Sequence, residues 1–254
     1  MSRKTVCMSW TTLALALIAF TAWAGSPLVV DDASIHSLEE LEWVPAYETL
    51  RSGSVDTRTA TLSLATGLNS RAEISVRAGY GWLRDRDPAA PRAGEGVLDL
   101  NLGVKGTLWE AGSVPFRFSA SGAVKIPTAT VKSGLGTGYA DFTGLGIGTF
   151  ILGTVLVDLN AGFTWTAVEQ RSRRTGDAWF AGSAVRWRVT DPLLFFAESY
   201  ASKPTAPGVG SAVAMRLGGQ YEFFKGISLN LAVGRGRNQG VVESLGLIGL
   251  TINR

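Results

Sequence analysis

Charged side chains in several segments of this sequence stand at positions of one parity, opposite in parity to the apolar residues, and they are the residues best placed to do chemistry. The basic ones are Arg77, Lys105, Arg117, Lys125, Arg186, Arg188 and Arg216, and the acidic ones are Glu73, Asp99, Asp158, Glu198 and Glu222. Successive side chains of a β-strand point to opposite faces. The charges therefore share one face of each predicted strand, where they either line a polar pathway for a solute or pair with one another and fill it.

Enzymatic chemistry is not favoured. His36 is the only histidine and precedes every predicted strand, so no nucleophile is placed beside it as a general base requires. We interpret it as a solvated polar residue. The segment 134–138 lacks the Lys-Ser/Thr and the strand–helix context of a phosphate loop. Asp31-Asp32 is at best a weak calcium candidate, since no His, Cys and Asp group has metal-ligand spacing. We expect no catalytic residue, metal or cofactor.

The segments that carry the charges alternate with period two. In 98–108 the apolar residues share one parity and the polar or small residues share the other, and the same holds for 72–82, 114–126, 155–165, 213–223 and 227–233. A charge that faces lipid at the bilayer midplane costs about 2–4 kcal/mol. If the sheet lies in a membrane, the charged parity must therefore face inward, and the apolar parity must face the lipid.

Connections between these segments alternate in length. Short ones are expected at 67–71, 110–113, 153–154, 191–192 and 225–226, and longer ones at 84–95, 127–139, 169–177, 202–211 and 236–240. Short periplasmic turns and longer outer loops are typical of outer-membrane barrels. The sequence therefore predicts an all-β fold, a transmembrane antiparallel up-and-down β-barrel of about 12 strands, with both termini in the periplasm.

The N-terminus has the three parts of a secretory signal peptide. Arg3 and Lys4 are positive, residues 11–20 are apolar, and small residues stand at Ala22 and Ala24. The apolar run is shorter than the about 20 residues that span a bilayer. We therefore expect three parts in the chain: a cleaved signal peptide at 1–24, a periplasmic lead-in at 25–40 without periodicity, and the barrel at 41–254.

Charge and cysteine content exclude some function classes. The chain has 24 Lys and Arg against 21 Asp and Glu, and removal of the predicted signal peptide leaves 22 against 21. No basic cluster indicates nucleic-acid binding. Cys7, the only cysteine, leaves with the signal peptide, so no disulfide is expected. The expected partners are the lipid bilayer, the barrel-assembly machinery and a small-molecule solute, and the oligomeric state stays open.

Four short segments carry a family resemblance. They are GLNSRAEISV at 67–76, GVLDLNLGVKGTL at 96–108, KIPTAT at 125–130 and GLGTGYADF at 134–142. In these segments the chain resembles the outer-membrane transporters associated with the meta-cleavage pathway of phenol degradation. Ala129 stands where a glycine would follow Pro-Thr in the family. The resemblance implies a barrel and an uptake role, and no particular substrate.

Two functions remain open. The first is an outer-membrane channel or transporter for small organic molecules, aromatic or hydrophobic ones among them, with a narrow charged lumen. The second is a structural or interaction barrel with a plugged lumen and partner-binding outer loops. Twelve strands lie between the eight that side chains fill and the 16–18 that hold open channels. We expect an inward orientation for the basic residues at 117, 125, 186, 188 and 216, and we expect several of them to pair with Asp99, Asp158, Glu198 or Glu222. Arg and Lys are in slight excess over Asp and Glu on this face, which in a pore would favour anionic or neutral solutes.

Overall fold

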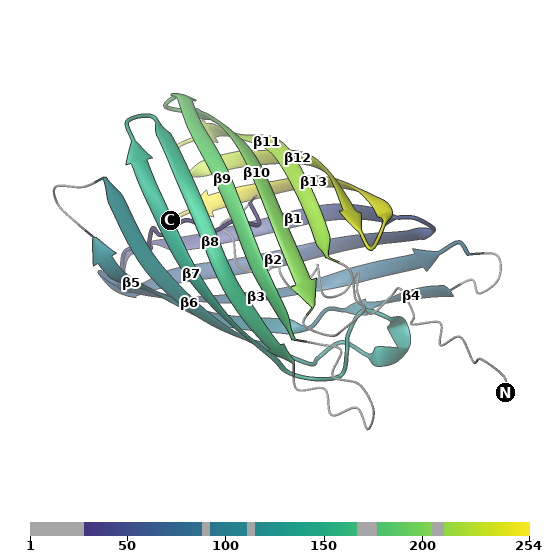
Figure 1. The fold of residues 1–254 in the computed structure, drawn as a ribbon. Helices are drawn as coiled ribbons and strands as arrows, with labels where there is room; N and C mark the ends of the chain where they lie inside the picture. Colours follow the sequence, from purple (N-terminus) through teal and green to yellow (C-terminus); the bar gives the residue numbers. More distant parts are fainter. Residues whose placement is uncertain (1–27, 88–91, 111–114, 167–176, 205–210) are drawn as a thin grey trace, which may run out of the picture.

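The computed structural model describes residues 28–87, 92–110, 115–166, 177–204 and 211–254, and most of these residues are in β-strands (Figure 1). The strands are β1 (Leu41–Ser52), β2 (Val55–Asn69), β3 (Ala72–Asp85), β4 (Arg92–Val97), β5 (Leu100–Glu110), β6 (Phe116–Ile126), β7 (Asp141–Leu152), β8 (Val155–Thr166), β9 (Ala178–Thr190), β10 (Leu193–Pro204), β11 (Ala212–Phe224), β12 (Ile227–Asn238) and β13 (Val241–Asn253). A single 3-10 turn, η1 (Val131–Ser133), interrupts the loop after β6. Within the described ranges no helix is both long and apolar enough to cross a membrane. The predicted signal peptide, 1–24, lies outside the described residues.

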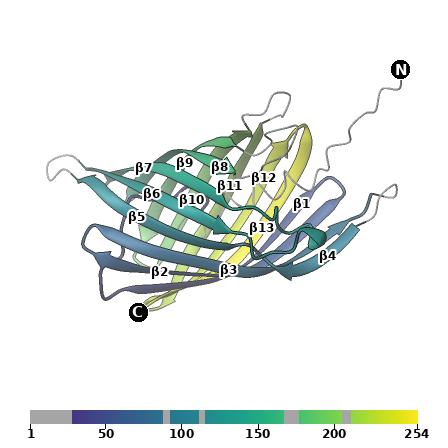
Figure 2. The same ribbon diagram turned by 90° about the horizontal axis from the view of Figure 1, so that it is seen from below.

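The sheet closes on itself. Every strand pairs antiparallel with its neighbours, and the last strand, β13, pairs with the first (Figure 2). Leu41 and Arg254 exchange backbone hydrogen bonds of 3.0 and 3.1 Å at this seam. β4 and β5 follow one another along β3 and form one wall strand. The prediction of an antiparallel barrel of about twelve strands is therefore confirmed.

A β-bulge separates β4 from β5. Between the paired residues, three residues of this wall strand (98–100) lie opposite two of β3 (78–79). A bulge puts two consecutive side chains on one face. Leu98 accordingly packs with the buried residues of the inner face, next to the buried Asp99. The alternation predicted Leu98 to share the outer parity of Leu100, and the bulge makes that prediction wrong.

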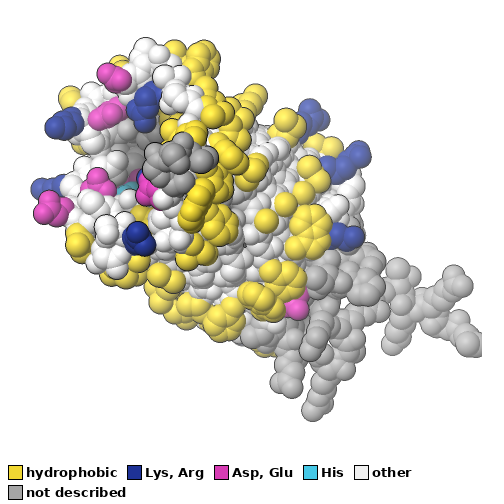
Figure 3. Space-filling view, turned by 60° about the vertical axis from the view of Figure 1, so that its left-hand side comes forward, with side chains coloured by type: hydrophobic (Ala, Val, Ile, Leu, Met, Phe, Trp, Pro, Cys, Tyr) yellow, Lys and Arg dark blue, Asp and Glu magenta, His cyan; other side chains and the backbone are white. Residues whose placement is uncertain are grey.

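The outer face of the barrel is apolar. Figure 3 shows a broad hydrophobic band around the middle of the wall, with charged side chains gathered toward both ends. Large exposed side chains of this band include Trp43, Trp82, Trp109, Trp165, Trp179, Trp187, Phe195 and Phe223. Aromatic residues at both edges of an apolar band are typical of barrels that lie in a bilayer.

The two ends of the barrel differ in their connections. At one end, here called the short-turn end, β1 begins, β13 ends, and two-residue turns follow β2, β7, β9 and β11. The longer loops after β3, β6, β8 and β10 lie at the opposite end, the long-connection end. Two connections at that end are nevertheless tight turns, 53–54 and 239–240. The predicted loop at 236–240 is therefore wrong, because β12 continues to Asn238.

Candidate functional site

Residues 28–36, hereafter the lead-in segment, lie inside the barrel. Leu28 to Asp31 are buried. Oε2 of Glu198 on β10 accepts hydrogen bonds from the backbone N–H groups of Val29 (2.7 Å) and Val30 (2.9 Å). On β8, the Asn160 side chain accepts from the backbone N–H of Asp31 and donates to its carbonyl, both at 2.8 Å. The sequence predicted a periplasmic lead-in at 25–40, and the structure places residues 28–36 of it against the inner wall.

The segment then continues around the wall toward β3. The backbone N–H of Ala33 donates to Thr149 Oγ1 on β7 at 2.9 Å, and its carbonyl accepts from Ser119 Oγ on β6 at 2.8 Å. The backbone N–H of His36 donates to Glu73 Oε2 on β3 at 2.9 Å. Each of these hydrogen bonds joins the segment's backbone to a side chain of the wall. Wall side chains therefore hold the segment in the lumen, and it is not a strand of the sheet.

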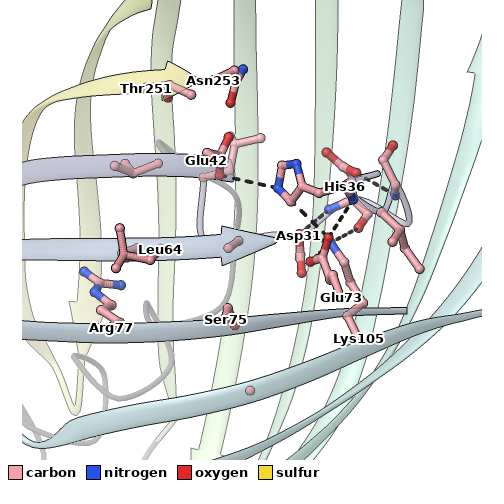
Figure 4. Close-up of a pocket in the computed structure, with 18 of the residues that line it drawn as sticks. Asp31, His36, Glu42, Leu64, Glu73, Ser75, Arg77, Lys105, Thr251 and Asn253 are labelled. Carbon is pink, nitrogen blue, oxygen red and sulfur yellow. Dashed lines mark hydrogen bonds and ion pairs between the residues drawn. The ribbon is translucent and has the colours of Figure 1, made fainter. Parts of the chain in front are cut away.

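Lys105 on β5 is the central cation of one charge cluster (Figure 4). Its Nζ lies 3.4 Å from Asp31 Oδ1 of the lead-in segment and 3.1 Å from Glu73 Oε1. His36 Nε2 lies 3.7 Å from Glu42 Oε1 and 4.0 Å from Glu73 Oε2. His36 thus faces two carboxylates and is partly buried, which corrects the expectation of a freely solvated residue.

Arg186 on β9 joins the wall to Asp32 of the segment. Its Nε lies 2.7 Å from Asp158 Oδ2, and its Nη1 lies 2.9 Å from Asp32 Oδ2. Asp158 also accepts a hydrogen bond of 2.7 Å from Thr149. Burial alone would raise the pKa of Asp32, but the positive charges of Arg186 and Lys105 lower it to about 2. Asp32 is therefore an anion at neutral pH.

Arg216 on β11 lies in a third cluster with two carboxylates and an aromatic ring. Its Nη2 is 3.3 Å from Glu48 Oε1, and its Nε is 3.6 Å from Glu198 Oε1. Its guanidinium carbon lies 5.7 Å from the centre of the Tyr200 ring, a cation–π distance. Gly234 on β12 makes room for this side chain, since a β-carbon there would lie 2.8 Å from Arg216 Cγ.

A fourth cluster lies near the long-connection end. Lys125 on β6 pairs with Asp141 and lies 3.4 Å from Asp99 Oδ2. Asp99 Oδ1 accepts a 2.9 Å hydrogen bond from the backbone N–H of Ala129, at the start of the loop 127–140. Ala129 and Leu135 are buried with residues of β2 and β3. The loop after β6 is therefore folded into the mouth of the barrel.

The lead-in segment also makes apolar contacts. Leu28 packs with Leu194, Phe196 and Ala232. On the other side, Val29 packs with Phe180, Tyr200 and Ala212. Burial of apolar side chains stabilises by roughly 25 cal/mol per Å² removed from water. Both apolar and polar contacts therefore hold the segment on the wall formed by β9 to β12.

A cavity of about 600 Å³ opens beside the segment. Its lining includes Asp31 and His36 from the segment, and Glu73, Arg77 and Lys105 from the wall, with Asn253 at the end of β13 (Figure 4). Leu194 and Phe196 contribute an apolar part of the lining. The inner space is thus shared by the segment and a mainly polar cavity.

The structure brings ten of the twelve predicted lumen residues to the inner wall, in the four clusters and the cavity lining. These are Glu73, Arg77, Asp99, Lys105, Lys125, Asp158, Arg186, Arg188, Glu198 and Arg216. Arg188 lines the cavity close to the short-turn rim, where it donates to the carbonyl of Asp191. The other two lie at that rim: Arg117 pairs with the exposed Glu110, and Glu222 accepts from the N–H of Gly226 in the turn after β11. A role of any of these residues in transport stays a prediction.

The charge balance of the interior differs from the expected one. The wall carries four further inward carboxylates, Glu42, Glu48, Asp141 and Glu243, and the segment adds Asp31 and Asp32. With them, acidic groups outnumber basic groups among the described inner residues. The expected slight excess of arginine and lysine is therefore wrong. The adjacent pair of carboxylates after the apolar Leu28–Val30 is the sequence signal that indicates a charged contact of this segment.

Comparison with a family model decides the family. The model described as "Putative MetA-pathway of phenol degradation" matches residues 46–252. The chain belongs to this family. The match begins within β1 and ends within β13, so it covers the barrel and leaves out the lead-in segment. No curated protein matches the sequence.

Solved structures confirm the fold. The barrel is similar to an outer membrane channel from Pseudomonas putida F1, with a TM-score of 0.71 and 15% identity over 88% of this chain and 98% of that one. It is also similar to the translocator domain of the autotransporter NalP from Neisseria meningitidis, with a TM-score of 0.59 and 13% identity over 84% and 88%. The KdgM porin, solved with disordered oligogalacturonate, gives 0.58 and 10% identity over 82% and 98%. At these identities the likeness concerns the fold alone.

Proposed function

We propose that the protein is an outer-membrane channel for small organic molecules, aromatic or hydrophobic ones among them. Its short-turn end and both termini face the periplasm, and the signal peptide is removed on export. The observation that carries the proposal is the position of the lead-in segment inside the barrel. The space inside the twelve strands is occupied by a piece of backbone that wall side chains hold, so its departure would leave an open lumen.

The wall itself supports this proposal because it leaves room for the segment. Gly67 on β2 has no side chain where the backbone of His36 and Ser37 passes, and Gly182 on β9 has none where Val30 lies. Barrels of eight strands are filled by the side chains of their own walls. In this barrel the two glycines leave space on the inner wall, and the segment, not wall side chains, occupies that part of the lumen.

The family and the structural neighbours agree with a transport role. The family's description concerns phenol degradation, and the Pseudomonas putida protein is named an outer membrane channel. A channel must stabilise its solute without holding it too tightly. The mixed lining of the cavity, with Leu194 and Phe196 beside charged groups, suits small organic molecules that carry both apolar and polar parts.

A second candidate function is a structural barrel with a permanently closed lumen and partner-binding outer loops. The four charge clusters favour it, because they connect the wall to the segment and to the loop 127–140. Ion pairs that hold the segment and the loop inside the barrel do not by themselves show that either can leave the lumen. Whether the lumen ever conducts separates the two candidates.

Planar-bilayer conductance of the purified barrel in KCl separates the two. The channel proposal expects discrete conductance steps from the native protein, and larger or longer ones when Asp31→Asn and Asp32→Asn weaken the segment's ion pairs. Heat-modifiable gel mobility and membrane fractionation check that both proteins are folded barrels in the outer membrane. If the native and variant proteins are folded barrels and neither conducts, the channel proposal is contradicted and the structural barrel remains.

A further inference from the structure

The wall behind Leu28–Val30 has the composition of a small-molecule site. Phe180 and Tyr200 lie with ring centres 6.1 Å apart and pack against Val29. Leu194 and Phe196 pack against Leu28. Sites for small molecules are usually lined by apolar and aromatic side chains with a few polar groups that fix orientation. The three residues of the segment therefore occupy an aromatic-lined depression.

Two buried polar groups face the same place. Glu198 is 3% exposed and Arg216 is 2% exposed. Glu198 Oε2 accepts hydrogen bonds from the two N–H groups of Val29 and Val30. Its other oxygen, Oε1, lies 3.6 Å from Arg216 Nε, an ion pair that is too long for a hydrogen bond. The N–H groups of the segment are therefore what satisfies Oε2, and a ligand that donates a hydrogen bond would take their place on Glu198.

The depression is adjacent to the cavity. Leu28 and Val30 of the segment line the cavity, as do Leu194 and Phe196 of the depression. A molecule in the cavity would thus reach the aromatic wall as soon as the segment moved aside. The segment's contacts there are three apolar side chains and two N–H donors, which is the chemistry that a competing molecule would have to reproduce.

We propose that this wall is a solute site and that Leu28–Val30 occupies it in the absence of solute. The inference rests on the proposed channel function and names its solute class: an apolar, planar or compact molecule with a hydroxyl or amine donor. The donor replaces the N–H groups on Glu198, and the apolar body replaces the side chains of Leu28 and Val29. Binding of solute therefore releases the segment.

The test measures exposure of the segment with a single cysteine. Cys7 is the only native cysteine and lies in the predicted signal peptide, so Val30→Cys places one thiol in the mature barrel. Val30 is 0% exposed, so a maleimide should label it slowly. We expect 4-ethylphenol to accelerate labelling in a saturable way. Its methyl ether, which lacks the donor, should need an about tenfold higher concentration for the same effect, since it cannot make the hydrogen bond to the buried carboxylate, and glucose should have no effect.

Leu135→Cys is the matched control. Leu135 belongs to the loop after β6, is 2% exposed, and packs with Val55 and Leu83 and not with the segment, so 4-ethylphenol should leave its labelling unchanged. Val29→Cys, also buried, replaces the first variant if that one does not fold. Equal acceleration at Leu135, or none at Val29 and Val30, would overturn the inference. Conductance of the same proteins tests the channel function separately, because a conducting barrel without solute-dependent labelling refutes only the site.

Discussion

Val30 of the lead-in segment lies directly against Gly182 of β9. A β-carbon on Gly182 would come within 2.7 Å of Val30 Cγ2, and Val30 is fully buried. No real side chain fits at such a distance unless one of the partners moves. The missing side chain at Gly182 is therefore what allows the segment to lie on this part of the wall.

A larger residue at this position should expel the segment. We expect Gly182→Leu to fold as a barrel and to show a conductance several-fold above that of the native protein, because the new side chain takes the place of Val30. Gly122→Leu is the matched control, since a β-carbon at Gly122 meets nothing within 4 Å. Planar-bilayer recording measures both. An unchanged conductance in a folded Gly182→Leu barrel would contradict the idea that the segment blocks the lumen.

Arg186 should matter far more for stability than its neighbour on the same face, Arg188. Arg186→Met leaves Asp158, which is 0% exposed, without its cation and should lower the free energy of unfolding by about 3–5 kcal/mol. Arg188→Met removes only a hydrogen bond to a carbonyl at the exposed rim and should change it by less than about 0.5 kcal/mol. Urea unfolding of both variants in detergent checks the difference. Similar losses for the two would refute the assigned ion pairs.

Acid should weaken the anchoring of the segment at Asp32. The pKa of this carboxyl is lowered from 3.8 to about 2, so its charged form stabilises the folded state above pH 3.8, and this contribution is lost as the pH falls through about 2. The melting temperature of the native barrel should therefore fall between pH 4 and 2. Asp32→Asn should flatten that part of the curve, and Asp191→Asn, at an exposed turn, should not. If the melting temperature depends on pH in the same way in all three proteins, the ion pair between Asp32 and Arg186 does not stabilise the barrel.

Ion selectivity follows from the excess of inward carboxylates. We expect the channel to prefer cations, as measured by the reversal potential in a KCl gradient. Replacing Arg186 and Arg188 with serine should increase that preference, and neutralising Asp31 and Asp32 should reduce it. An anion preference in the native protein would mean that the basic residues dominate the conducting path after all.

The barrel could be predicted from the sequence because its signal is local. Alternation with period two places Lys105, Asp158 and Arg216 on the inner face, and a one-residue slip of register would have turned them into the lipid. The failures were also local. At Leu98 the bulge adds a residue and reverses the parity, and at Gly234 and Gly236 glycines that make room inside the barrel resembled the glycines of a loop.

The lead-in segment could not be predicted in the same way. It has no periodicity, because it is not part of the sheet. Its partners, from Glu73 to Glu198, come from strands far apart in the sequence, and they meet only when the barrel closes. The adjacent carboxylates of Asp31 and Asp32 indicate a charged contact, but nothing near them in the sequence identifies Lys105 and Arg186 as the partners.

The most direct test of the account is a reversible lock between Val30 and Gly182. The two positions are close enough for a disulfide, whose β-carbons lie about 3.5–4.5 Å apart, so the variant Val30→Cys with Gly182→Cys should form one. We predict that the oxidised barrel does not conduct in a planar bilayer, and that addition of dithiothreitol to the same membrane restores conductance steps. The same conductance before and after reduction, with the bridge verified by mass spectrometry, would show that the segment does not have to move and would contradict its role as the obstruction of the lumen.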